Sequence, residues 1–100
     1  MSMIERIFNA LVTLVKGPLS AEAIRERLAE AAKSVPEASN WNGSIVDLLK
    51  VLKLGSSLAE RRTLYREYEG LGKYTGSAEQ NIWLHQQVMA DVGRRYRGAS

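Results

Sequence analysis

Hydrophobic residues recur at helical spacing along most of the chain, and the widest apolar stripe lies near its end. At about 100° per residue, a helix over Ala78–Arg97 places on one face Ala78, Ile82, His85, Met89, Val92 and Tyr96. Leu84 and Val88 extend this stripe sideways. Because so wide an apolar arc needs cover on more than one side, the pattern predicts the central helix of a small bundle.

Four earlier segments show the same periodicity, and a serine stands at the N-cap position of every predicted helix. The predicted helices cover residues 3–15, 21–34, 45–54, 58–69 and 78–97. Ser2, Ser57 and Ser77 each stand three residues before a Glu or Gln, which is the spacing of a capping box. Gly55 is predicted to be the left-handed residue after the third helix, and Gly70 to end the fourth.

The absence of any strand-like alternation or internal repeat predicts an all-α fold. We expect a compact bundle of about five short helices around a central C-terminal helix. Residues 1–100 form a single helical domain in this interpretation, with an amphipathic N-terminal helix (1–16) and a four-helix body (20–97). Gly17-Pro18 is a conceivable boundary between the two parts. The predicted core contains Ile45, Leu48, Leu49, Leu52, Leu58, Ile82 and Met89.

The N-terminal helix has more apolar surface than a single docking face needs. Its apolar arc spans roughly 200°. Phe8 and Leu11 lie near the middle of the arc and are predicted to pack inside the bundle. Ile7, Ala10 and Leu14 lie on one flank, where we predict contact with a protein partner or a second copy of the chain.

A second candidate interaction surface follows one edge of the C-terminal helix. It consists of Trp83, Gln87, Arg94 and Arg97. An aromatic beside arginines can dock on a partner or stack on a base. The alternative is that the N-terminal helix covers Trp83, while the arginines are solvated and offset the helix dipole.

Arg61, Asn81 and His85 are polar residues that fall within apolar faces. Because buried polar groups need hydrogen-bond partners, we expect a structural network here. His85 is the only histidine, no metal-ligand spacing accompanies it, and no nucleophile motif such as G-x-S-x-G is present. We therefore assign no catalytic, cofactor-binding or metal-binding residues and no cofactor.

Composition and charge narrow the function classes. The chain has no cysteine, which excludes disulfides and cysteine zinc sites and suits the cytoplasm. A net charge of +3 is weaker than dedicated nucleic-acid binders usually carry. No run approaches the ~20 apolar residues of a membrane span, and no signal peptide is evident. We expect a cytoplasmic protein with no membrane span and no specific nucleic-acid binding.

Roughly half of the chain resembles a known family. The matching segments are Trp41-x-x-Ser44-Ile45-Val46-Asp47-Leu48-Leu49-Lys50, Ser56-Ser57-Leu58-Ala59-x-Arg61, Tyr74-Thr75-Gly76 and Asn81-Ile82-Trp83-Leu84-His85-x-Gln87-Val88-Met89. Their order and spacing resemble a small bacterial all-helical family catalogued as a domain of unknown function. The resemblance implies a mainly helical fold and brings no established activity, so it assigns no functional residues. A shorter run, Leu71-Gly72-x-Tyr74-x-Gly76, is similar to a loop of helical peptidoglycan-binding modules.

These observations leave several function hypotheses. The leading one is a non-enzymatic protein-interaction or structural module that uses the N-terminal helix and the Trp83 edge. A cell-wall glycan-binding module is the alternative, and it requires Trp41, Tyr74 and Trp83 to converge on one exposed groove. A small-molecule site or enzyme requires a concave pocket that opens onto His85, Asn81 and Arg61. Weak nucleic-acid binding through the C-terminal arginines is the fourth.

Overall fold

Serine caps begin the helices as the sequence predicts. A computed structural model describes residues 1–96, and Arg97 of the predicted interaction surface lies outside this range. Along residues 1–96 the chain forms α1 (Met3–Leu14), α2 (Ala21–Ala32), η1 (Pro36–Ala38, a 3-10 helix), α3 (Ile45–Val51), α4 (Leu58–Glu67) and α5 (Ala78–Arg95). The side chains of Ser2, Ser20, Ser44, Ser57 and Ser77 each accept a hydrogen bond from the third amide of the following helix. The all-α fold is confirmed.

The C-terminal ends of α1 to α4 come earlier than predicted. After α3 and α4, a residue that precedes the expected glycine takes the left-handed conformation. Lys53, with φ 59°, takes the left-handed position expected for Gly55, and the Leu54 amide donates to the Leu49 carbonyl at 2.9 Å. Glu69, with φ 57°, takes the left-handed position after α4. The prediction for Gly55 is wrong, and Gly70 lies one residue after the left-handed position.

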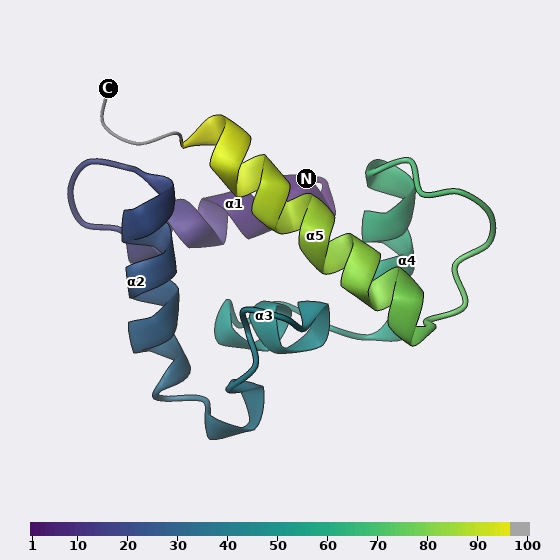
Figure 1. The fold of residues 1–100 in the computed structure, drawn as a ribbon, viewed down its shortest axis with the longest axis horizontal. Coiled ribbons are helices and arrows are strands. Elements are labelled where there is room, and N and C mark those ends of the chain that lie inside the picture. The colour runs from purple at the N-terminus through teal and green to yellow at the C-terminus, as the bar shows by residue number, and fades with distance from the viewer. Residues whose placement is uncertain (97–100) are drawn as a thin grey trace.

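The helices cross at several angles and do not form a parallel bundle (Figure 1). α5 runs diagonally across the molecule, with α1 behind it, α3 below it, and α2 and α4 at opposite ends (Figure 1). α1 packs against both α2 and α4, and α3 packs against η1 and α5. Fully buried side chains from all five α-helices meet between these elements, namely Ile7, Leu11, Ile24, Leu28, Ile45, Leu48, Leu49, Leu64, Leu84, Val88 and Val92.

The buried face of α5 is rotated from the predicted stripe. Its buried residues are Leu84, His85, Val88, Asp91 and Val92. Ile82 is 52% exposed and Leu58 42% exposed, so both are wrong as core predictions, while Met89 is half-buried. The predicted α3 core residues Ile45, Leu48, Leu49 and Leu52 are confirmed.

The wide apolar arc of α1 is covered within the chain. Ile7 is 0% exposed and belongs to the core, so its prediction as an outward contact is wrong. Phe8 and Leu11 are buried as predicted. α1 packs against both α2 and α4, so more than one neighbouring helix covers its apolar surface. Ala10 and Leu14 remain half-buried and line a hollow of about 410 Å³ with residues of α2 and α3.

A long-range cap fixes the start of α1. The carboxylate of Glu67, in the last turn of α4, accepts hydrogen bonds from the Met3 amide at 2.9 Å and the Ile4 amide at 2.8 Å. Ser2 satisfies the next amide, that of Glu5. The capping bonds from the Ser2 amide and hydroxyl hold the pKa of Glu5 below its ordinary value. Because the first amides of a helix have no intrahelical acceptors, these contacts tie α1 firmly to α4.

None of the helices within residues 1–96 has the length and apolar character needed to cross a membrane. In the same range, no three His, Cys, Asp or Glu side chains are grouped so that they could hold a metal ion.

Candidate functional site

The predicted polar spot is divided into two separate hydrogen-bond arrangements. Arg61 Nη1 donates to the Tyr74 hydroxyl and to Asn81 Oδ1, both at 3.1 Å, and its Nε donates to the Ser56 carbonyl at 3.1 Å. The Tyr74 hydroxyl also donates to Asn81 Oδ1. This network joins α4, the loop after it and α5, and all its acceptors are neutral oxygens. Arg61 is therefore held in a structural position.

His85 lies outside that network. Its Nε2 is 2.8 Å from the carbonyl oxygen of Trp41. Since a carbonyl can only accept, Nε2 carries the proton and donates. The side chain is buried, and this bond links α5 to the loop that contains η1.

Replacing His85 by alanine is expected to lower the free energy of unfolding by about 1–3 kcal/mol. The substitution leaves the Trp41 carbonyl without its side-chain donor and removes a buried side chain. Urea unfolding followed by circular dichroism measures the change. Gln86→Ala, one residue away and exposed, is the control and should stay within about 0.5 kcal/mol of the unsubstituted protein. Equal stability of both variants would contradict the structural role of His85.

Asp91 is the centre of a further cluster of polar side chains, near the C-terminal end of α5. The Tyr68 hydroxyl donates to Asp91 Oδ2 at 2.9 Å, and Arg95 Nε donates to Oδ1 at 3.2 Å. Arg94 of the predicted interaction surface pairs with the same carboxylate at 3.4 Å. Burial, and then the hydrogen bond to Asp91, raises the pKa of the Tyr68 phenol far above its ordinary value. Tyr68 therefore remains a neutral donor, and the cluster is structural.

Trp83 packs against Tyr65 of α4. Its ring meets the Tyr65 ring edge-on at 5.2 Å between centroids, and Tyr65 in turn lies 5.2 Å from the Tyr74 ring. The ring contact of Trp83 is therefore with α4, whereas the alternative interpretation expected the N-terminal helix there. Trp83 lines a hollow of about 330 Å³ together with Tyr65, Leu71, Glu79 and Gln80, which we call the apolar pocket. Gln87 and Arg94 do not line it.

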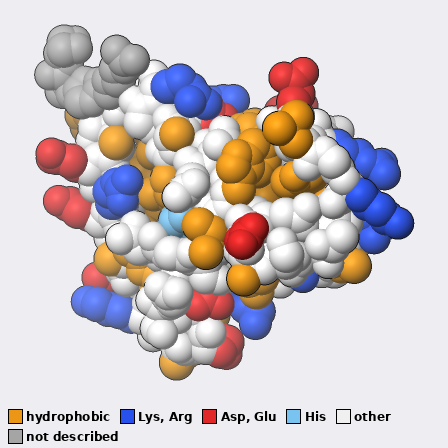
Figure 2. All heavy atoms as spheres, turned by 45° about the vertical axis from the view of Figure 1, so that its right-hand side comes forward, with side chains coloured by type: hydrophobic (Ala, Val, Ile, Leu, Met, Phe, Trp, Pro, Cys, Tyr) orange, Lys and Arg blue, Asp and Glu red, His pale blue; other side chains and the backbone are white. Residues whose placement is uncertain are grey.

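Leu71 is the most exposed large hydrophobic residue within residues 1–96. Its side chain is 91% exposed at the edge of the apolar pocket. Figure 2 brings forward the right-hand side of Figure 1, where α4 and the following loop lie. Hydrophobic side chains gather there, and Lys and Arg side chains follow the neighbouring edge (Figure 2).

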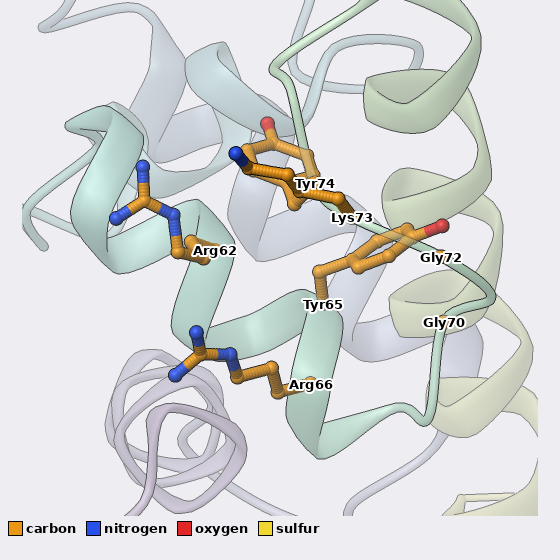
Figure 3. A pocket seen from close by; sticks show the side chains of 7 residues that line it. All are labelled: Arg62, Tyr65, Arg66, Gly70, Gly72, Lys73 and Tyr74. Atoms are coloured by element: carbon orange, nitrogen blue, oxygen red, sulfur yellow. The ribbon is translucent and has the colours of Figure 1, made fainter.

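A second hollow, of about 450 Å³, shares Tyr65 with the apolar pocket, and we call it the basic pocket. It is lined by Arg62, Tyr65, Arg66, Gly70, Gly72, Lys73 and Tyr74. Figure 3 shows Arg62 and Arg66 extending from α4 on the same side, with Lys73 alongside Tyr74. We did not predict this site from the sequence. The i, i+4 spacing of Arg62 and Arg66, followed by Lys73, is the sequence pattern that could have indicated it. We considered Arg61 instead, and this arginine is held in a structural network.

Tyr65 separates the two pockets and is itself fixed in place. It is 6% exposed, and its hydroxyl donates to the Leu71 carbonyl at 2.5 Å. A Cβ at Gly70 would overlap the Tyr65 ring, so this position requires glycine. The ring is therefore a rigid wall shared by the apolar pocket and the basic pocket.

Comparison with known proteins identifies the family. Residues 10–95 match the family described as Domain of unknown function (DUF3597). The chain belongs to this family. The match confirms the predicted resemblance to a family of unknown function, and it extends from the middle of α1 to the last residue of α5. No curated protein and no solved structure matches the chain.

The geometry of this DUF3597 domain bears on the glycan and enzyme hypotheses. Tyr74 is 4% exposed, and Trp41 lines neither the apolar pocket nor the basic pocket, so the three aromatics do not share a groove there. The hollows described above are lined by residues other than Arg61, Asn81 and His85. His85 therefore does not line the apolar pocket or the basic pocket.

Proposed function

We propose that this DUF3597 domain is a non-enzymatic protein-interaction module that binds an apolar side chain of a partner peptide in the apolar pocket. The observation that carries the proposal is the 91% exposure of Leu71 beside the half-buried Trp83. A leucine this exposed loses apolar contact with water only when another molecule covers it. Trp83, which is half-buried, supplies aromatic surface of the kind that is typical of the centre of protein interfaces.

The loop that carries Leu71 is held in shape before any partner binds. Gln80 Oε1 accepts from the amides of Thr75 at 2.8 Å and Gly76 at 3.1 Å, and Gln80 Nε2 donates to the Lys73 carbonyl at 2.9 Å. The bond from the Tyr65 hydroxyl holds the Leu71 carbonyl. Since little ordering remains to be done on binding, the exposed leucine is presented at low entropic cost.

The contribution predicted for the N-terminal helix has less support. Ile7 is internal, and α2 and α4 cover the flanks of α1. Ala10 and Leu14 remain as partly exposed residues beside a separate hollow. We therefore propose the apolar pocket as the interaction surface, and Trp83 is the member of the predicted set within residues 1–96 that lines it.

A random-peptide library displayed on phage tests the proposal. The unsubstituted protein is expected to select peptides that share an apolar residue, and Leu71→Ser is expected to abolish the selection. Leu19→Ser is the matched control, because Leu19 is an exposed leucine in the α1–α2 connection. Failure to select any motif, or a motif that Leu71→Ser leaves unchanged, would contradict the proposal.

Light scattering across concentrations separates a foreign partner from a second copy of the chain. A monomer at every concentration is expected for the unsubstituted protein if the partner is another protein. An oligomer that Leu71→Ser converts to a monomer, while Leu19→Ser does not, would assign the apolar pocket to self-association.

A further inference from the structure

We infer that the basic pocket binds acidic side chains of the partner peptide, next to the apolar residue held in the apolar pocket. This inference rests on the proposed function and gives the partner a chemical class: a peptide with an apolar residue flanked on one side by carboxylates. It follows from the charge of the pocket, from the position of Tyr65 and from the burial of the tyrosine rings.

The charge of the basic pocket is uncompensated. Arg62, Arg66 and Lys73 line it, and no acidic residue does. Within residues 1–96, the ion pairs of the structure involve other cations, namely Lys33, Arg94 and Arg95. The three charges therefore face one concave surface without a carboxylate partner. Arginine binds carboxylates through two parallel N–H donors, and a hollow lined by several cations raises the local concentration of anions.

The two pockets form one extended surface with a fixed direction. Tyr65 lines both of them, so a peptide side chain in the apolar pocket lies next to the entrance of the basic pocket. Glu79 lines the apolar pocket but not the basic pocket, and its carboxylate repels acidic residues at the apolar pocket. Acidic residues are consequently favoured on one side of the apolar residue and disfavoured on the other.

The tyrosine rings argue for a peptide and against a nucleic acid. Tyr65 and Tyr74 are 6% and 4% exposed, so their faces are not available for stacking on bases. Both hydroxyls are already engaged, one with the Leu71 carbonyl and one with Asn81. The pocket therefore offers positive charge and shape but no reading surface for a base.

The same phage library tests the inference when it is selected against two variants of equal charge. The first carries Arg62→Gln, Arg66→Gln and Lys73→Gln. The control carries Lys16→Gln, Lys33→Gln and Lys50→Gln, three exposed positions elsewhere. Each set removes three positive charges, so the net charge of +3 falls to zero in both. Differences between the variants then report the basic pocket and not long-range attraction.

We expect the unsubstituted protein and the control to select peptides with Asp or Glu on one side of the apolar residue. The pocket variant should keep the apolar residue and lose the acidic preference. The selected peptide, made synthetically, should bind the pocket variant about tenfold more weakly than the control, the sum of three partly exposed ion pairs. Replacing its acidic residues by phosphoserine distinguishes carboxylate from phosphate as the preferred anion.

Other outcomes overturn the inference in distinguishable ways. An apolar motif without an acidic preference refutes the inference and leaves the proposed function standing, whereas the absence of any motif refutes both. An acidic preference that persists in the pocket variant places the carboxylates elsewhere. Amide shifts of Gly70, Gly72 and Lys73 caused by phosphatidylglycerol vesicles or a single-stranded oligonucleotide, without an acidic peptide preference, would assign the pocket to those ligands.

Discussion

Leu49→Ala is expected to lower the free energy of unfolding by about 2–5 kcal/mol, whereas Ile82→Ala should lower it by less than about 1 kcal/mol. Leu49 is 0% exposed on α3, which packs against both η1 and α5, so its truncation leaves a cavity that rigid neighbours cannot fill. Ile82 has the same number of carbon atoms but is 52% exposed on α5. Urea unfolding curves of the two variants measure the difference.

The comparison of these two positions tests the orientation of α5 directly. The apolar stripe read from the sequence places Ile82 at its centre, and the structure places Leu84 and Val88 there. Equal losses at Leu49 and Ile82 would restore the original orientation. Val12→Ala, at another exposed aliphatic position, is the control for effects of helix propensity and solvent exposure.

The starts of the helices could be predicted because they depend on chemistry within four residues. Ser2 and Ser77 form complete capping boxes, and Ser20, Ser44 and Ser57 bond the expected amides. The helix ends could not be predicted to the same degree. Lys53 accepts a left-handed conformation, which is less favourable for lysine than for glycine, because the Leu54 amide returns to the Leu49 carbonyl there.

The face of α5 that is buried could not be derived from hydrophobicity alone. Two residues on its buried face, His85 and Asp91, are polar and take their partners from Trp41 and Tyr68. The pattern placed His85 on the apolar face as an isolated polar residue, but it left Asp91 outside that face and counted the exposed Ile82 as core. Because the hydrogen-bond partners of Asp91 cannot be derived from hydrophobicity, the predicted stripe is centred away from the face that is buried.

The candidate site could not be predicted from the sequence because it depends on contacts between distant residues. The loop after α4 contributes Leu71 to the apolar pocket and Lys73 to the basic pocket, and Tyr65 lines both. Neither the hydrogen bond from Tyr65 to the Leu71 carbonyl nor the contact with Gly70 has a sequence signature. Trp83 could be selected from its position on α5, but the residues it meets could not.

Ile7→Glu is expected to destabilise the protein by about 4 kcal/mol or more, whereas Leu14→Glu should lower stability by about 1 kcal/mol or less. Ile7 is 0% exposed on α1, which packs against α2 and α4, so the substitution places a carboxylate at a fully buried position of the apolar core. Leu14 is half-buried at the edge of a hollow, and a carboxylate there reaches solvent. Circular dichroism during urea unfolding measures both variants at neutral pH.

A change of pH supplies the internal check on this prediction. Burial raises the pKa of the introduced carboxyl group above its unfolded value, so the charged form is what penalises the folded state. The penalty is therefore largest at neutral pH and shrinks as the pH falls toward about 4 and the group becomes neutral in the folded protein. The Leu14→Glu variant should show no such recovery, because its carboxylate is solvated. A folded Ile7→Glu variant of unchanged stability would return Ile7 to the surface, and with it the interaction predicted for the N-terminal helix.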